Sequence, residues 1–213
     1  MLAVGTIEAL PIADESVDLI FTDPPYPTRF LHVYEWLARE AMRVLRPGGW
    51  CVCMAGGLNL NVIFRMFDDA GLRYFYTMAL KTPRQAPVVW RHVGGKSYPI
   101  VARVKHLLVY SKGEAVPRMG GVMNLYESLR WGESKRWHYW GQDVDTCRYY
   151  IEYFSGPGDV VLDPFVGGGT TLVAARLVDR IGVGIDVDPA AVSRAAERIA
   201  GVDLPLNVPL FPA

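Results

Sequence analysis

The sequence has 213 residues, of which 51% are hydrophobic and 21% charged, enough apolar material for a single domain over residues 1–213 with its own core. Twenty-two lysines and arginines balance 22 aspartates and glutamates, which excludes a uniformly basic or acidic protein. No leader pattern opens the chain and no apolar run is long enough to cross a bilayer, so we expect a cytoplasmic protein without a membrane partner.

The first part of the chain contains a short strand signal and then a longer apolar run. The strand signal covers Leu2–Ile7, and Val17–Phe21 reads as a buried strand because β-branched and aromatic residues are flanked by turn formers. Asp23 would then sit at the carboxyl end of a parallel strand, where ligands bind in open α/β sheets. Pro24 and Pro25 fix the backbone and leave rigid carbonyl acceptors in the turn.

The segment Asp23-Pro24-Pro25-Tyr26 combines acceptors with an aromatic ring. A carboxylate and a stiff carbonyl can accept both protons of an exocyclic amino group, and Tyr26 offers a face for the attached ring. The pattern therefore predicts a site for an amino group on a planar base. The alternative is a turn capped by an aspartate.

The middle of the chain alternates helical and extended patterns. In chain order they predict a helix over 30–45, a strand over Trp50–Met54, a helix over 58–70, and strands over Tyr74–Leu80 and Val101–Tyr110. A long loop rich in proline and glycine separates the last two strands, and loops of this length are usually functional. Cys51, Cys53 and Cys147 lack the paired spacing of a disulfide framework or zinc site, so we expect core thiols and no metal.

Charge is distributed unevenly although its sum is zero. Residues 81–136 hold eleven lysines and arginines against three acidic residues, a net charge of +8, and four of the six tryptophans lie in or just after this segment. Cations neutralise phosphates and flat rings stack on bases, so the segment favours a nucleic-acid surface. A solvated basic face that meets an acidic partner chain is the alternative.

A second motif follows near the carboxyl end of the chain. The strand Val160–Leu162 leads through a glycine-rich turn, 163–169, into a helix over Thr170–Leu177, and the strand Ile181–Ile185 then ends in Asp186. Glycines let the backbone approach a ligand, and an acid at the end of the next strand is where nucleotide sites bind ribose hydroxyls. A last helix is predicted over Pro189–Ala200, with Asp188 as its cap and Gly201 at its end.

The two motifs together resemble the S-adenosylmethionine-dependent amino-methyltransferases of DNA, which methylate adenine N6 or cytosine N4. The resemblance rests on Asp23-Pro24-Pro25-Tyr26, on the run from Leu162 to Thr171 and on Gly184-Ile185-Asp186. The catalytic motif precedes the cofactor motif, as in the permuted beta subgroup. The resemblance implies a Rossmann-like α/β fold with a mostly parallel twisted sheet, one antiparallel hairpin and helices on both faces.

The resemblance also implies site residues and partners. Asp23, Pro24, Pro25 and Tyr26 would be catalytic, and S-adenosyl-L-methionine would bind at Asp163, Phe165, Val166, Gly167, Gly168, Gly169, Thr170, Thr171, Asp186 and Val187. DNA would be the partner, with Arg84, Trp90, Arg91, His92, Arg130, Lys135 and Arg136 as candidate contacts.

The segment 113–137 lies where the beta subgroup inserts its target-recognition region. About twenty-five residues can barely supply the roughly 600–1,000 Å² that a small sequence-reading module buries. We therefore expect relaxed or short-site specificity, a homodimer, or a separate specificity partner.

Three functions remain open at this point. Adenine N6 transfer is preferred because the first motif residue is Asp23, where cytosine-N4 members of the subgroup more often have serine. Cytosine N4 transfer and RNA amino-methylation are the alternatives. A third class is an inactive subunit that binds cofactor and docks nucleic acid, against which the intact Asp23–Tyr26 motif argues.

Overall fold

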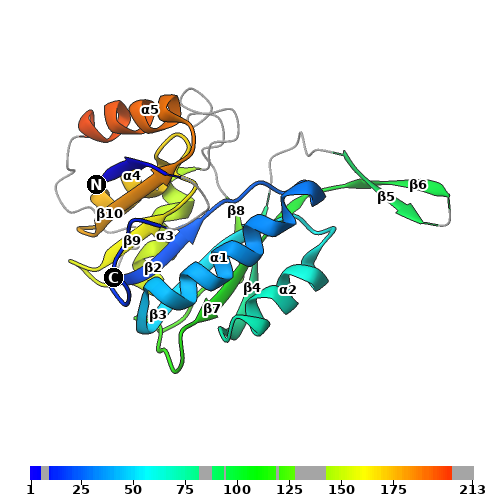
Figure 1. Cartoon of the computed structure of the whole chain (residues 1–213), viewed down its shortest axis with the longest axis horizontal. Helices are drawn as coiled ribbons and strands as arrows, with labels where there is room; N and C mark the ends of the chain where they lie inside the picture. The colour runs from blue at the N-terminus through cyan, green and yellow to red at the C-terminus, as the bar shows by residue number, and fades with distance from the viewer. Residues whose placement is uncertain (6–9, 82–87, 94, 119, 128–142, 203–213) are drawn as a thin grey trace.

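One eight-stranded sheet organises the chain in a computed structural model that describes residues 1–5, 10–81, 88–93, 95–118, 120–127 and 143–202. Its strands, in spatial order, are β1 (Leu2–Val4), β10 (Ile181–Asp186), β9 (Val160–Asp163), β2 (Val17–Thr22), β3 (Leu45–Ala55), β7 (Val104–Ser111), β4 (Arg73–Lys81) and β8 (Leu125–Glu127). The first five run parallel, β7 is antiparallel to both β3 and β4, and β8 is parallel to β4. The predicted fold class is confirmed (Figure 1).

Helices cover both faces of this sheet (Figure 1). One face packs against α1 (Leu31–Val44) and α2 (Leu60–Asp69), and the other against α3 (Val144–Phe154), α4 (Thr170–Leu177) and α5 (Pro189–Ala200). In β2, Ile20 joins the first core cluster while Leu19 and Phe21 join the second, because successive side chains point to opposite faces. A strand buried on both faces reads as a continuous apolar run.

The cap of α5 confirms the prediction from sequence. The Asp188 carboxylate accepts a 2.9 Å hydrogen bond from the Ala190 amide, Pro189 occupies the first turn, and Gly201 follows the last residue. At the start of α3 the Asp143 carboxylate accepts from the Thr146 amide and hydroxyl at 3.1 and 3.0 Å, a cap that the sequence reading missed.

Two segments differ from their predicted form. The strand expected over Trp50–Met54 begins at Leu45, because the amide of Gly48 donates to Lys112 and the amide of Lys112 donates to Gly49, which extends the pairing past Pro47-Gly48-Gly49. The expected loop between the middle strands contains a hairpin, β5 (Val88–Val93) and β6 (Lys96–Val101), which stands away from the sheet in Figure 1. Gly95, at φ 75°, lies in its turn.

The predicted insertion over 113–137 lies only partly within the described residues. Its described part runs to residue 127, without residue 119, and contains β8 at the edge of the sheet. Ala79 pairs with Leu125 and Lys81 with Glu127, so this segment extends the sheet beyond β4. Residues 128–137 lie outside the description.

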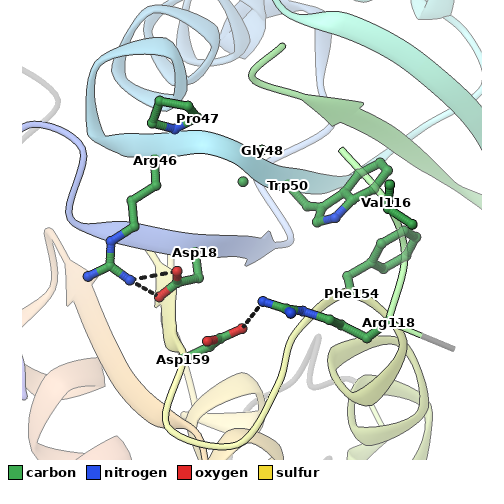
Figure 2. A pocket seen from close by; sticks show the side chains of 10 residues that line it. Asp18, Arg46, Pro47, Gly48, Trp50, Val116, Arg118, Phe154 and Asp159 are labelled. Carbon is green, nitrogen blue, oxygen red and sulfur yellow. Dashed lines mark hydrogen bonds and ion pairs between the residues drawn. The ribbon is translucent and has the colours of Figure 1, made fainter. Parts of the chain in front are cut away.

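A cavity of about 130 Å³ opens at the amino end of β2 and β9 (Figure 2). Two ion pairs line it: Arg46 donates to both oxygens of Asp18 at 2.6 and 2.5 Å, and Arg118 lies 3.6 Å from Asp159. The Asp18 carboxylate also accepts from the Val160 amide, which ties β2 to β9. Charged pairs therefore link the segments at the amino ends of β2 and β9.

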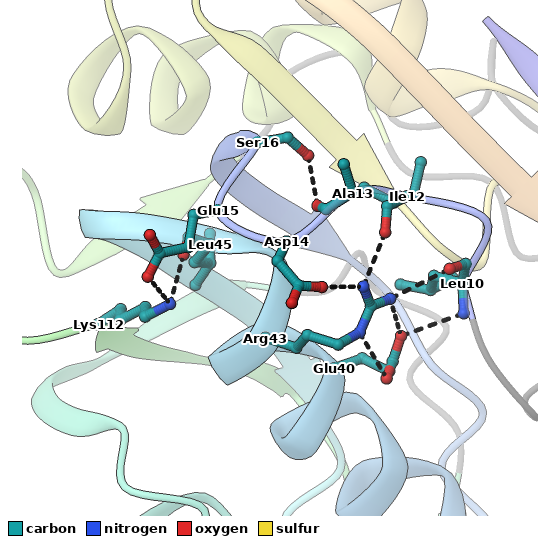
Figure 3. Close-up of polar contacts among 10 residues, drawn as sticks. All are labelled: Leu10, Ile12, Ala13, Asp14, Glu15, Ser16, Glu40, Arg43, Leu45 and Lys112. Carbon is teal, nitrogen blue, oxygen red and sulfur yellow. Dashed lines mark hydrogen bonds and ion pairs between the residues drawn. The ribbon is translucent and has the colours of Figure 1, made fainter.

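Residues 10–16, which lead into β2, contact α1 through the guanidinium of Arg43 (Figure 3). Arg43 donates to the carbonyls of Leu10 and Ile12 and to the carboxylates of Asp14 and Glu40, at 2.7 to 3.2 Å. Partial burial opposes ionisation of Glu40, but hydrogen bonds from Arg43 and from the Leu10 amide lower its pKa. The network fixes the approach of the chain to β2.

Candidate active site

The two predicted motifs meet at the carboxyl ends of two central strands of the sheet. Strands β2 and β9 are parallel neighbours, with Leu19 opposite Val161 and Ile20 opposite Leu162. From β2 the chain crosses through α1 to β3 on one side, whereas from β9 it crosses through α4 to β10 on the other. Ligands bind at the carboxyl ends of strands at such a switch point. Asp23 and the glycine-rich turn both follow these ends.

A buried hydrogen bond joins the two motifs directly. The Thr22 hydroxyl donates to an oxygen of Asp163 at 2.6 Å, and the same oxygen accepts from the Phe165 amide at 3.1 Å. Burial raises the pKa of Asp163 to about 6, against the opposing effect of the hydrogen bonds from Thr22, Thr171 and Phe165. Asp163 therefore links the strand that precedes Asp23 to the turn and to α4.

The turn after β9 requires glycine at Gly169. Its backbone has φ 75°, and an added Cβ would lie 2.9 Å from the Cβ of Ala195 in α5. The Val166 amide donates to the Ile185 carbonyl of β10 at 2.9 Å. The turn is thus fixed between α5 and β10.

A buried guanidinium, which the sequence reading missed, supports this turn from α5. Arg198 donates to the Gly168 carbonyl at 2.9 Å and to the Thr170 hydroxyl at 2.8 Å. It follows the buried Ala191 and Ala195 on the same face of the helix. A cation on an otherwise apolar helical face is the signal that could have found it.

Asp186 lies at the end of β10 beside the turn. One of its oxygens accepts from the Gly167 amide at 2.9 Å and the other from the Asp188 amide at 3.0 Å. Asp186 is partly exposed, and Val187 after it is 71% exposed. A carboxylate has about four acceptor positions, so Asp186 has the capacity to accept from further donors.

On the β2 side, the carboxylate of Asp23 contacts the side chains of Tyr26 and Lys105. The Tyr26 hydroxyl donates to one oxygen, and Nζ of Lys105 lies 3.2 Å from the other. The same Nζ lies 5.2 Å from the centre of the Tyr26 ring. Burial and then the charge of Asp23 raise the pKa of Tyr26 well above its usual value, so its hydroxyl keeps the donated proton. Pro24, the next residue in the chain, is buried.

Three of the predicted substrate contacts lie on the hairpin. Trp90, Arg91 and His92 are exposed on β5 of the hairpin, where the Arg91 guanidinium donates to the Leu58 carbonyl at 3.1 Å. Arg84, Arg130, Lys135 and Arg136 lie outside the described residues. The sequence also indicates no role for Thr22 or Lys105, whose partners are distant in sequence.

The cavity of Figure 2 lies at the amino ends of β2 and β9, whereas Asp23 follows the carboxyl end of β2. This cavity is therefore not the candidate active site. In the described part of the chain, no cluster of three histidine, cysteine, aspartate or glutamate side chains could hold a metal ion. The three cysteines are free and buried. No helix among the described residues is long and apolar enough to span a membrane.

Methyltransferases are among the known proteins that match this sequence. A family model described as DNA methylase matches residues 133–197, and one described as methyltransferase domain matches residues 1–53. The type II methyltransferase M.HpaI of Haemophilus parainfluenzae is 26% identical over 231 residues, covering 93% of this chain and 73% of that protein. Together, the residue ranges that the two family models match include both motifs.

Solved structures share the fold. The cytosine-N4-specific PvuII DNA methyltransferase superposes with a TM-score of 0.77 at 20% identity, covering 97% of this chain and 87% of that one. The M1.HpyAVI–SAM complex superposes with a TM-score of 0.69 at 23% identity, covering 86% and 89%. Membership of the permuted subgroup stays a prediction. The matched family model, the methyltransferase relatives and the shared fold together support an S-adenosylmethionine-dependent amino-methyltransferase.

Proposed function

We propose that this protein transfers a methyl group from S-adenosyl-L-methionine to the exocyclic amino group of a base in DNA, with adenine N6 as the preferred acceptor. One observation carries the proposal: Asp23 and the glycine-rich turn follow neighbouring parallel strands and are joined through the 2.6 Å Thr22–Asp163 hydrogen bond. An acceptor for an amino group and a turn suited to a nucleoside therefore lie together at the carboxyl ends of β2 and β9.

The turn and Asp186 fit the cofactor by their chemistry. Gly167, at φ 47°, exposes backbone beside a partly exposed carboxylate, which suits the ribose hydroxyls of S-adenosyl-L-methionine. Phe165 is partly exposed and supported edge-on by Trp36 at 5.8 Å between ring centres. Thr170 and Thr171 begin α4 at the end of the turn, and Asp163, the last residue of β9, is hydrogen-bonded to Thr171. The cofactor supplies a methyl group already activated on a sulfonium.

The chemical work left to the protein is positioning and electrostatics. Asp23 and the Pro24 carbonyl would accept the two amino protons and orient the nitrogen lone pair. Holding both reactants in line can supply roughly 7–11 kcal/mol of the barrier. A base in a duplex must leave the stack to reach Asp23, at a cost of a few kcal/mol. The Tyr26 ring would then contact the flipped base.

The hairpin β5–β6 supports DNA as the partner. Residues 88–103 carry three cations and no acidic residue, and Trp90 is 54% exposed. Two-stranded hairpins are marginally stable alone, so this exposed hairpin would gain from a partner surface. Its charge matches a phosphate backbone, and a two-stranded ribbon fits the major groove.

Removal of the Trp90 side chain tests whether the β5–β6 hairpin contacts DNA. Trp90→Ala is expected to weaken duplex binding by roughly 1 kcal/mol or more, the loss of one aromatic contact, and to leave cofactor binding unchanged. Fluorescence anisotropy with a labelled duplex measures the effect. Tyr76→Ala, which removes an exposed ring from β4, is the control. Equal DNA affinity of Trp90→Ala and the parent would remove Trp90 from the interface.

The function itself is tested with methyl-labelled cofactor and three polymers: duplex DNA, single-stranded DNA and RNA. Nucleoside mass analysis should show N6-methyladenine from DNA. N4-methylcytosine would reassign the base, and methylation of RNA alone would overturn DNA as the substrate. Cofactor binding without transfer to any polymer would overturn the enzymatic proposal in favour of an inactive subunit.

A further inference from the structure

Lys105 belongs to a strand that neither motif includes, yet it reaches the candidate amino-binding site. Because β7 is antiparallel to β3, its first residues lie beside the carboxyl end of β3, with His106 opposite Ala55. Nζ of Lys105 lies 3.2 Å from an oxygen of Asp23. The Lys105 side chain is 16% exposed and that of Asp23 is 22% exposed, so the pair is largely enclosed.

The Lys105 ammonium packs against the side chain of Tyr26. It lies 5.2 Å from the centre of the Tyr26 ring, whose hydroxyl donates to the other oxygen of Asp23. Behind the ring the backbone of Gly56 approaches closely, since an added Cβ would lie 3.4 Å from the Cβ of Tyr26. Lys105, Asp23 and Tyr26 thus form one contact group.

The group presents an acceptor and a donor side by side. The Asp23 carboxylate accepts hydrogen bonds, and the Lys105 ammonium only donates them. Adenine and cytosine carry a matching edge, an amino donor next to an unprotonated ring nitrogen. Guanine and thymine carry a carbonyl next to a ring N–H at the corresponding positions, the reverse order. Flipped bases are read by hydrogen bonds to this edge.

We propose that Lys105 is a specificity-determining residue that donates to the ring nitrogen beside the target amino group while Asp23 accepts from that amino group. This inference rests on the proposed function. In the free protein Lys105 is paired with Asp23, and base entry exchanges this contact for the ring nitrogen. The ammonium opposes the positive charge that develops on the amino nitrogen, and the Asp23 carboxylate offsets it. Lys105 therefore selects the base edge at some expense of rate.

A purely structural Lys105 would serve only as the counterion of Asp23. The two roles differ in one respect: only a specificity-determining Lys105 senses whether the ring position beside the amino group is nitrogen. Replacing that nitrogen by C–H, as in 1-deazaadenine or 3-deazacytosine, removes the acceptor and keeps the amino group.

The experiment compares kcat/KM for duplexes with the natural base and its deaza analogue, in the wild type and in Lys105→Met. The wild-type penalty for the deaza base should exceed that of Lys105→Met by about tenfold or more, the effect of one charge-assisted hydrogen bond. Lys105→Arg, which keeps the charge, should retain most of the penalty. Lys81→Met removes a cation that pairs with Glu127 at 2.7 Å, and should keep the wild-type penalty.

The outcomes separate this inference from the function on which it rests. Transfer to the natural base with equal deaza penalties in the wild type and Lys105→Met would overturn the inference alone. Absence of transfer by the wild type to either natural base would overturn the proposed function and the inference together. Thermal unfolding of each variant shows that it is folded, and Lys105→Arg tests the inference if Lys105→Met unfolds.

Discussion

The proposed cofactor side and the proposed base side of the candidate site are stabilised in different ways. On the cofactor side, the turn after β9 is fixed by backbone hydrogen bonds and by the buried side chains of Asp163 and Arg198. On the base side, the partly exposed Asp23 is contacted through the side chains of Tyr26 and Lys105. The side chains that fix the cofactor side are buried, whereas Asp23 is partly exposed, so an incoming group can replace its partners.

This difference matches what each side must do. A small cofactor is bound well by a preorganised turn, because little conformational freedom remains to be lost. A flipped base must replace existing contacts at Asp23 each time it enters and leaves. We therefore expect substitutions on the base side to reduce turnover with little effect on cofactor affinity, and substitutions on the cofactor side to do the reverse.

The largest effect is expected from Asp23→Ala. Loss of one preorganised acceptor at the reacting nitrogen should lower kcat by about 10²- to 10³-fold, while cofactor affinity stays within about twofold. Methyl transfer and calorimetric titration measure the two effects. Asp18→Asn, at the opposite end of the same strand, is the matched control and should keep turnover. A parent-like rate for Asp23→Ala would break the comparison, because Asp23 would then not act at the reacting nitrogen.

Signals that span few residues located most of the fold. The bounds of α4 and α5 follow from apolar spacing between glycines and from the Asp188–Pro189 start. The expected loop 81–100 contains nearly all of the β5–β6 hairpin. Each strand of a hairpin is stabilised mainly by its partner, which local turn signals do not reveal. Pairing across the sheet likewise extended β3 past its glycines.

The candidate site divides in the same way. Asp23, the glycine turn and Asp186 each belong to a short motif that is readable in one stretch. Lys105 is separated from Asp23 by 82 residues, and Thr22 from Asp163 by 141. No local pattern encodes these contacts, because they depend on the order of strands in the folded sheet.

A smaller effect, on binding rather than turnover, is expected from Asp186→Ala. It removes the acceptor proposed for the ribose and the partner of the Gly167 amide, so cofactor affinity should fall by about 10- to 100-fold, or about 1.4 to 2.8 kcal/mol. Calorimetry provides the measurement. Asp188→Ala removes the neighbouring carboxylate that caps α5, and should cost about 1 kcal/mol of stability with unchanged affinity. Equal affinities of Asp186→Ala and the parent would exclude Asp186 from the cofactor site.

The smallest effect concerns the buried carboxylate that joins the two sides. The pKa of Asp163 is raised to about 6 in the folded protein, from about 3.9 in an unfolded chain. The folded state therefore binds more protons between these values, and this group contributes stability that is present at low pH and lost as the pH rises through about 6.

Asp163→Asn isolates that contribution, because asparagine does not titrate and can still accept a hydrogen bond from Thr22. Between pH 7 and pH 5 the free energy of unfolding of the wild type should increase by about 1.3 kcal/mol relative to Asp163→Asn. Urea unfolding at several pH values gives the difference curve, in which groups common to both proteins cancel. A flat difference curve would mean that the carboxylate is hydrated, and the join between the cofactor side and the base side would then be as exchangeable as the contacts around Asp23.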